Sequence, residues 1–153
     1  MPLIIAKLLI AALGLVGFLL ANYIRCTKRD QAPLVCPLEG SCETVVHSEY
    51  SKLFGIPLEY IGMAYYGLIT LFYLLFAFIP QTLPTAVLYF ILSLTVAAFA
   101  FSIYLTAVQA FVLKHWCTWC LCSAMICTAI FILVIYLSDL SLKEIFTSLT
   151  SLL

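Results

Sequence analysis

Charged residues are scarce in this sequence. Lys, Arg, Asp and Glu make up 9% of its 153 residues, whereas about a quarter of the residues of an ordinary globular protein are charged. The seven basic residues balance the seven acidic ones, and they form neither a basic patch nor a known nucleic-acid-binding motif. The composition therefore gives no basis for nucleic acid binding, and we expect no nucleic acid partner.

The N-terminal segment lacks the features of a cleavable signal peptide, because it has neither a charged start nor a clear cleavage site with small residues. Residues 4–24 are apolar apart from Lys7 and Asn22. This segment is long enough to cross a hydrocarbon core about 30 Å thick. Gly14 and Gly17 within it allow another helix to approach closely. We therefore expect a retained first membrane span.

Apolar residues make up 65% of the sequence, which is more than a soluble fold of this length can bury. Three further segments are apolar enough to cross a membrane, namely residues 57–79, 83–113 and 117–137. Because only closed hydrogen-bonded elements can cross lipid, we expect these segments to be helices. The predicted fold class is all-α, with a four-helix bundle in the membrane and a single domain over residues 1–153.

A polar segment follows the first span and a short tail follows the last. Residues 25–56 hold most of the charges, two prolines and two glycines. We predict a large extramembrane loop here, with a short helix over residues 41–54 that is capped by its first residue. The apolar residues of 138–153 follow helical spacing, and Ser141 with Glu144 matches a capping box, so an interfacial amphipathic helix is expected.

Four of the seven cysteines form two pairs. Cys36 and Cys42 lie in the large loop, whereas Cys117 and Cys120 form a C-x-x-C motif where the fourth span begins. Successive membrane crossings place the loop after the first span and the turn after the third span on the same side. We therefore expect all four cysteines at one face of the membrane.

The positions of these pairs favour thiol–disulfide exchange. Cys117 and Cys120 can reach each other across one helical turn, and the N-terminus of a helix favours a thiolate. The loop between Cys36 and Cys42 contains a proline and a glycine and is flexible enough to bring Cys42 against another disulfide. Electrons can then be relayed between the pairs through a mixed disulfide.

Two other interpretations of the four cysteines stay open. A structural zinc site is one, although the five-residue gap between Cys36 and Cys42 is a poor match to a zinc knuckle. Two inert structural disulfides are the other. We rank both below the redox relay and predict no metal ligands.

A longer pattern surrounds the cysteines. It consists of Cys36, Cys42, Ser48, the run Phe54-Gly55-Ile56-Pro57, Gly62, Tyr66 and Cys117-Thr118-Trp119-Cys120. In order and spacing, roughly residues 20–137 resemble the vitamin K epoxide reductase (VKOR) family. The five-residue gap between the loop cysteines resembles its bacterial and archaeal members.

The resemblance implies a membrane thiol:quinone oxidoreductase that supports protein disulfide formation. Cys36 would exchange with a thioredoxin-fold protein, and Cys42 would form a mixed disulfide with Cys117. Cys120 would meet the quinone, and Ser48 would help to bind a quinone carbonyl. The quinone, ubiquinone, menaquinone or a related compound, would lie in the bundle near the active face. Because many relatives carry a fused thioredoxin-like domain and this chain ends in a short tail, we expect a separate partner.

One departure from the animal enzymes bears on the substrate. They place a tyrosine four residues beyond the C-x-x-C motif, where this sequence has Ala124. A plain quinone is therefore favoured, and a vitamin K quinone or epoxide reductase is the alternative. Another four-helix disulfide oxidase family keeps its C-x-x-C in the loop after the first span, so its motif order differs. A four-cysteine metal-binding membrane protein is the non-enzymatic alternative.

Several polar residues near the cysteines have two interpretations each. Ser102, Thr106 and Gln109 share one face of the third span, where they serve interhelical hydrogen bonds or line the site of the quinone head group. His47 and His115 are either interfacial residues or proton donors. In each case the structural interpretation is the favoured one.

The other candidates favour structural roles. Glu59 is expected to hold the loop by an ion pair. Tyr65, Tyr66, Trp116 and Trp119 match an interfacial aromatic belt. The cysteines outside the two pairs are expected to act as small apolar residues; they are Cys26, Cys122 and Cys127.

Basic residues predict the orientation of this multi-pass cell membrane protein. Those on the side of the cysteines are Arg25, Lys28, Arg29, Lys52 and Lys114. The opposite side has Lys7 and Lys143. The positive-inside rule therefore places the active face in the cytoplasm, although in most of the resembling family it lies outside. Disulfide formation in the cytosol is known from hyperthermophiles.

Overall fold

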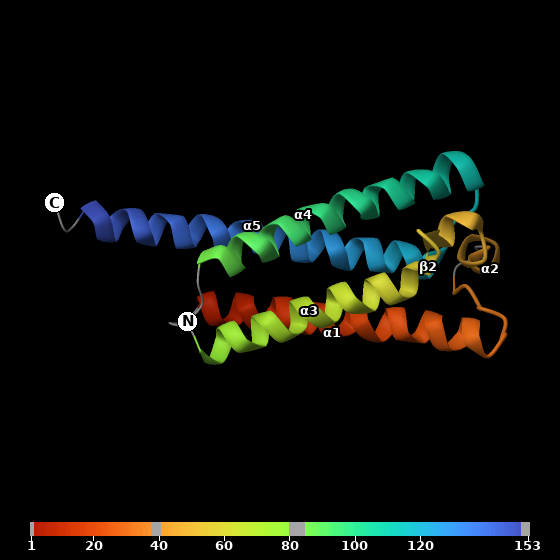
Figure 1. Cartoon of the computed structure of the whole chain (residues 1–153), viewed down its shortest axis with the longest axis horizontal. Coiled ribbons are helices and arrows are strands. Elements are labelled where there is room, and N and C mark those ends of the chain that lie inside the picture. Colours follow the sequence, from red (N-terminus) through yellow and green to blue (C-terminus); the bar gives the residue numbers. More distant parts are fainter. Residues whose placement is uncertain (1, 38–40, 80–84, 151–153) are drawn as a thin grey trace.

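Four long helices form the bulk of the molecule and lie side by side (Figure 1). The computed structural model describes residues 2–37, 41–79 and 85–150. The long helices are α1 (Pro2–Arg29), α3 (Leu58–Phe78), α4 (Thr85–Ala107) and α5 (Thr118–Thr150). Each contains a segment long and apolar enough to cross a membrane. The predicted all-α membrane bundle is thus confirmed.

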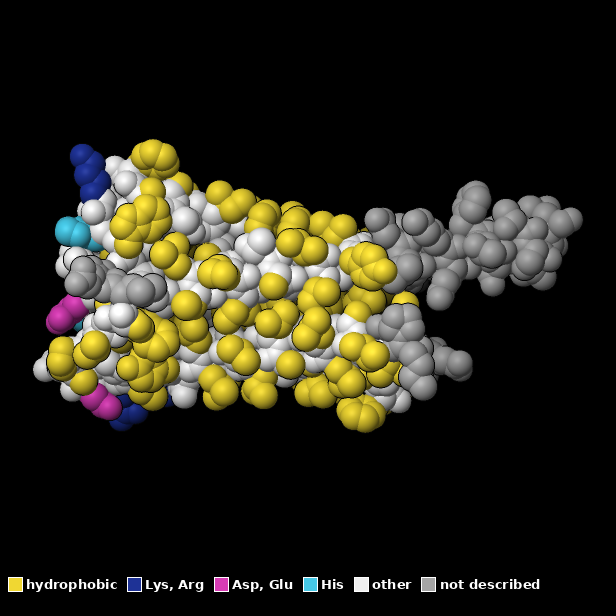
Figure 2. All heavy atoms as spheres, turned by 180° about the vertical axis from the view of Figure 1, so that it is seen from behind, with side chains coloured by type: hydrophobic (Ala, Val, Ile, Leu, Met, Phe, Trp, Pro, Cys, Tyr) yellow, Lys and Arg dark blue, Asp and Glu magenta, His cyan; other side chains and the backbone are white. Residues whose placement is uncertain are grey.

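One residue from each long helix meets at the centre of the bundle. Ile10, Ile69, Ile91 and Ile130 are almost completely buried in one hydrophobic cluster. The outward faces carry many exposed large apolar side chains, as expected of helices whose solvent is lipid (Figure 2). On the face drawn in Figure 2, charged and histidine side chains gather at one end of the bundle.

Helices α1 and α3 approach each other at two glycines of α1. A Cβ atom on Gly14 would lie 2.5 Å from Oγ1 of Thr70, and one on Gly17 would lie 2.6 Å from the ring of Tyr66. Only glycine leaves room for the neighbouring helix at these distances. The predicted close helix approach at both glycines is therefore confirmed.

Short elements follow α1 and cover one end of the bundle, opposite the end where both termini lie (Figure 1). They are α2 (Cys42–Val46), the 3-10 helix η1 (Glu49–Ser51), and the strands β1 (Lys52–Leu53) and β2 (Ile56–Pro57). The strands pair antiparallel around a two-residue turn, Phe54-Gly55, in which both residues have positive φ. Gly55 suits this turn because glycine adopts positive φ without strain.

The helix predicted over residues 41–54 is wrong in extent. The α-helix ends at Val46, and the hydroxyl of Ser41 makes no capping hydrogen bond. The rest of the segment forms the 3-10 helix and the hairpin. The pattern of polar and apolar residues indicated an ordered segment but not that the α-helix would end at Val46 and be followed by a hairpin.

Two helix ends also differ from the prediction. Helix α1 continues to Arg29, so residues 25–29 are helical and not part of the loop. Helix α5 runs without a break to Thr150, so no new helix begins at Ser141. Hydropathy indicates where lipid contact ends, whereas backbone hydrogen bonding can continue into water. The amphipathic character of the tail and the single-domain boundary stay predictions.

A π-helical segment, η2 (Val108–Leu113), extends α4 toward the cysteines, and it ends at Lys114 in a left-handed conformation with φ 53°. The described part of the third span ends where it was predicted to end. The predicted start of that span at residue 83, the turn expected from Pro80 and Pro84, and residues 151–153 lie outside the described residues.

Candidate functional site

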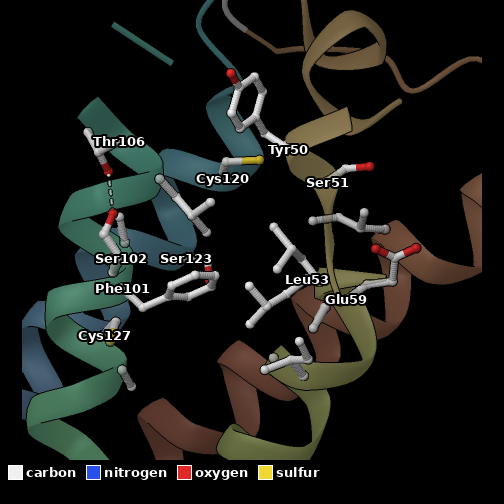
Figure 3. A pocket seen from close by; sticks show the side chains of 18 of the residues that line it. Tyr50, Ser51, Leu53, Glu59, Phe101, Ser102, Thr106, Cys120, Ser123 and Cys127 are labelled. Carbon is white, nitrogen blue, oxygen red and sulfur yellow. Dashed lines mark hydrogen bonds between the residues drawn. The ribbon is translucent and has the colours of Figure 1, made fainter. Parts of the chain in front are cut away.

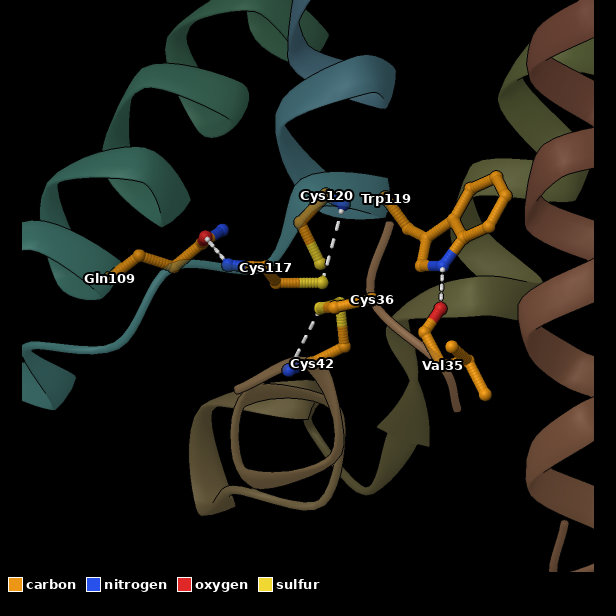
Figure 4. The surroundings of a disulfide bond; sticks show 7 residues. All are labelled: Val35, Cys36, Cys42, Gln109, Cys117, Trp119 and Cys120. Carbon is orange, nitrogen blue, oxygen red and sulfur yellow. Dashed lines mark hydrogen bonds between the residues drawn. A yellow bond between two sulfur atoms is a disulfide. The ribbon is translucent and has the colours of Figure 1, made fainter. Parts of the chain in front are cut away.

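The outer cysteine pair is a disulfide between Cys36 and Cys42 (Figure 4). Cys42 is the first residue of α2 and is only 1% exposed, whereas Cys36 is half-buried. The backbone N–H of Cys42 donates a hydrogen bond to the sulfur of Cys36, with a distance of 3.2 Å between the two atoms. Cys36 is therefore the more accessible of the two disulfide-bonded cysteines.

The inner pair consists of the free thiols Cys117 and Cys120. Cys117 is fully buried and directly precedes α5, and its sulfur accepts a hydrogen bond from the backbone N–H of Cys120 at 3.4 Å. The thiol of Cys120 and the backbone N–H groups of Cys120 and Trp119 donate to Cys117 and lower its pKa, although burial acts against this. A lowered pKa favours the thiolate, which is the form that attacks disulfides.

The fold brings the two pairs together at one end of the bundle. Cys42 and Cys117 belong to the same buried cluster, and Cys36 and Cys120 pack against its edge. Figure 4 shows the sulfur of Cys117 directed toward the disulfide. The arrangement places an inner thiol beside an outer disulfide, as thiol–disulfide exchange requires.

A cavity of about 380 Å³ lies beneath the loop elements, between the four long helices (Figure 3). Its lining is mostly apolar, and Cys120 contributes to its wall. The polar side chains that line it include Ser48, Glu59, Ser102, Thr106 and Gln109. A concave apolar site with a few polar groups is the usual form of a small-molecule site. The inner pair therefore connects the cavity with the loop disulfide.

The match to a family model covers residues 8–135 and carries the description Vitamin K epoxide reductase family. The chain belongs to this family. Membership implies a membrane oxidoreductase linked to a quinone or its epoxide. No curated protein matches the chain.

Ser48 lies at the cavity of this VKOR-family chain, and its predicted role in binding a quinone stays a prediction. Its hydroxyl donates a hydrogen bond to the carbonyl oxygen of Val45 at 2.7 Å. The hydroxyl can accept a further hydrogen bond in this state. To donate to a ligand it must first release Val45.

The polar face of the third span lines the cavity, which favours the functional interpretation of Ser102, Thr106 and Gln109. The hydroxyl of Thr106 donates to the backbone oxygen of Ser102 at 2.9 Å. Gln109 also makes the interhelical contact that the structural interpretation required, because its side-chain oxygen accepts a hydrogen bond from the backbone N–H of Cys117 at 3.2 Å. Gln109 therefore both makes a structural hydrogen bond and lines the cavity.

Tyr65 and Tyr66 do not belong to an interfacial belt, so that prediction is wrong for them. Both line the cavity, and Tyr66 is buried with its hydroxyl donating to the backbone oxygen of Ser123 at 2.9 Å. Tyr50, which the sequence analysis did not single out, also lines the cavity. Tyr66 is part of the pattern that resembles the VKOR family, but its contact with Ser123 depends on a distant segment and is not visible in the sequence.

Trp119 joins three segments and does not act only as a belt residue. Its indole N–H donates to the backbone oxygen of Val35 at 3.1 Å, and its ring lies 5.0 Å from the ring of Tyr23, centroid to centroid. The side chain thereby ties the start of α5 to the loop and to α1. Trp116, by contrast, is exposed.

The ion pair predicted for Glu59 is confirmed. Its carboxylate lies 3.2 Å from the ammonium group of Lys28, and both side chains are largely shielded from solvent. The pair joins the end of α1 to the start of α3, because Lys28 is helical. The ion pair therefore holds together the two helix ends that the loop connects.

The two histidines lie away from the cavity. His47 is exposed and its Nδ1 lies 3.0 Å from the backbone oxygen of Glu43, and His115 is also exposed. Neither is among the described residues that line the cavity. Their positions favour the interfacial interpretation.

The cysteines outside the two pairs have three different environments. Cys26 is exposed, Cys122 is half-buried, and Cys127 is buried in the cavity wall. Cys127 thus matches the expected small apolar residue, whereas the exposure of Cys26 places it at the surface.

Proposed function

We propose that this VKOR-family chain is a thiol:quinone oxidoreductase that supports protein disulfide formation. One observation carries the proposal. Cys117 shares a buried cluster with Cys42, whereas Cys120, one helical turn later, lines the cavity. A single C-x-x-C motif can therefore exchange with the loop disulfide on one side and deliver electrons to a ligand on the other.

Electrons enter at Cys36, the more accessible cysteine of the outer pair. A thiolate of a separate thioredoxin-fold protein attacks the sulfur of Cys36 and breaks the bond to Cys42, which leaves as a thiolate. The second thiol of the partner, once deprotonated, then attacks the mixed disulfide. The partner departs with a disulfide, and Cys36 and Cys42 are reduced.

Cys42 passes the electrons inward. Its thiolate attacks Cys117 of an oxidised Cys117–Cys120 pair, forms the Cys42–Cys117 disulfide and releases Cys120 as a thiolate beside the cavity. The thiolate of Cys36 then attacks Cys42 and displaces Cys117. The outer pair is again a disulfide and the inner pair is reduced, with the low pKa of Cys117 making it a good leaving group.

The cavity fits a quinone head group. Its volume of about 380 Å³ lies within the range of small-molecule sites, and its wall is apolar with a few hydrogen-bonding groups. When bound, a quinone such as ubiquinone or menaquinone accepts two electrons and two protons. The thiols of Cys117 and Cys120 supply both as they form a disulfide. Ser48 can donate to a carbonyl oxygen once its hydroxyl releases the backbone oxygen of Val45. Ala124 also lines the cavity and offers only a methyl group.

The proposal is tested with purified protein, a reduced thioredoxin-like protein or dithiothreitol, and ubiquinone-1 or menadione. We expect Cys120→Ala to abolish quinone reduction with either thiol, because the residue at the cavity is lost. Cys36→Ala should abolish reduction by the protein partner and retain reduction by dithiothreitol, because a small dithiol does not need to dock at Cys36. Absorbance of the quinone and the redox state of the partner are the readouts.

Cys122→Ala is the matched control, since Cys122 lies on α5 outside the described wall of the cavity. It should behave as the wild type. Equal and complete loss of dithiothreitol-driven activity in Cys36→Ala and Cys120→Ala would contradict the separate roles. Stoichiometric zinc in the purified protein without quinone turnover would support the metal-binding alternative instead.

A further inference from the structure

Gln109 is a polar side chain at the junction of the cavity and the inner cysteine pair. It is only 4% exposed and lies in the π-helical segment η2, where it lines the cavity. π-Helical turns inside longer helices are rare and often occur at functional sites. A buried amide needs hydrogen-bond partners for both its oxygen and its nitrogen.

The oxygen of this amide has its partner. It accepts the hydrogen bond from the backbone N–H of Cys117 at 3.2 Å (Figure 4). Because a backbone N–H can only donate, the oxygen must face Cys117 and the amide nitrogen must point away from it. The side chain thereby holds the residue that directly precedes α5.

The nitrogen of this amide has no partner within the described residues. The hydrogen bond to Cys117 uses only the oxygen of the amide. Because the side chain of Gln109 lines the cavity, its nitrogen can donate to a ligand bound there.

Two hydroxyl groups at the cavity are already engaged as donors. The hydroxyls of Ser48 and Thr106 donate to backbone oxygens. A ligand that recruited either as a donor would first have to break an existing hydrogen bond, whereas the nitrogen of Gln109 loses nothing. Gln109 is thus a ready donor to a carbonyl oxygen inside the cavity.

We propose that Gln109 links quinone binding to the cysteine relay. Its oxygen holds the backbone of Cys117, and its nitrogen donates to a carbonyl oxygen of the quinone beside Cys120. The same side chain then fixes the reacting cysteine pair and the position of the acceptor. This inference rests on the proposed function, since it takes the ligand of the cavity to be a quinone.

The test compares Gln109→Met with the wild type in the full-length, reduced protein. Methionine has a similar length but can neither hold the N–H of Cys117 nor donate to a quinone. We expect ubiquinone-1, followed by quenching of tryptophan fluorescence, to bind about five- to tenfold more weakly. Without quinone, hydrogen exchange at the backbone N–H of Cys117 should be at least several-fold faster.

Two further variants control the result. Val112→Ala changes a lipid-exposed residue of the same π-helical segment and should leave both readouts unchanged. Gln109→Asn keeps the amide but is one methylene shorter, so it cannot make both contacts at once. It should lose part of the quinone affinity even if Gln109→Met folds poorly.

The outcomes separate this inference from the proposed function. Wild-type affinity for ubiquinone-1 in both Gln109 variants would overturn the quinone contact, and unchanged hydrogen exchange at Cys117 in both would overturn the hold on the cysteine. A wild-type protein that binds ubiquinone-1 without reducing it would refute the proposed oxidoreductase activity. Quinone binding and hydrogen exchange would still test the role of Gln109 in that case.

Discussion

The sulfur of Cys117 occupies the position that a capping oxygen usually takes at the start of a helix. Cys117 directly precedes α5, and its sulfur accepts the backbone N–H of Cys120, three residues later. Serine and aspartate side chains accept the same N–H at the N-cap position. A partial or full negative charge on this sulfur is favoured by the helix N-terminus. The thiolate is thus stabilised by the way the helix begins.

This local arrangement predicts a shift in the pH dependence of alkylation. In Cys120→Ala the thiol that donates to Cys117 is missing, so the pKa of Cys117 should rise toward its ordinary value. The midpoint of its alkylation by iodoacetamide, followed by mass spectrometry of the Cys117 peptide, should therefore move to higher pH. Cys122→Ala should keep the wild-type midpoint. A midpoint that stays the same or falls in Cys120→Ala would contradict the assigned cause.

At the scale of elements, the close packing of α1 on α3 shapes one wall of the cavity. Gly17 faces the ring of Tyr66, and Tyr66 in turn lines the cavity and bonds α5 at Ser123. The backbone of α1 is therefore the support against which this tyrosine is held. The contact between Gly17 and Tyr66 therefore affects both the packing of α1 on α3 and the shape of the cavity.

We predict that Gly17→Ala destabilises the protein by about 1–3 kcal/mol, because the added methyl group overlaps the ring of Tyr66. Gly67→Ala is the matched control, since its added Cβ would meet the ring of Phe18 at an ordinary 3.6 Å. Thermal unfolding of both variants in detergent gives the comparison. Equal melting temperatures for the two variants would show that Tyr66 can move aside without cost.

The loop is an element of its own, held by contacts at several places. Trp119 bonds Val35, and Lys28 pairs with Glu59 where the loop leaves and enters the bundle. Together they keep the disulfide-bearing segment above the cavity. The loop can thus present Cys36 to a partner while Cys42 stays buried beside Cys117.

For the whole molecule, the distribution of basic residues leads us to propose a cytoplasmic active face. Five of the seven basic residues lie on the side of the cysteines. Both termini lie at the other end of the bundle (Figure 1), so this orientation places the C-terminus outside. Alkaline phosphatase fused after Leu153 should then be active, since it folds only outside the cytoplasm. An inactive phosphatase together with a fluorescent cytoplasmic reporter at the same position would reverse the orientation.

The sequence by itself determined the number of spans, the membrane class and the end of the bundle at which the cysteines meet. Hydropathy and chain length are enough for these, because a helix must be apolar over the thickness of the bilayer. The order of the relay through Cys36, Cys42, Cys117 and Cys120 is what the resemblance to the VKOR family implies, and it stays a proposal. The position of Glu59 at the entrance of the second span also indicated an ion pair, although not its partner Lys28.

Only the tertiary structure decided how the site is built. The contacts of Tyr66 with Ser123 and of Trp119 with Val35 join residues 57 and 84 positions apart, and no local pattern encodes them. Gln109 could have served helix packing or the cavity, and its hydrogen bond to Cys117 shows that it does both. The physical reason is that burial and hydrogen bonding depend on which helix faces which, and periodicity within one helix does not carry that information.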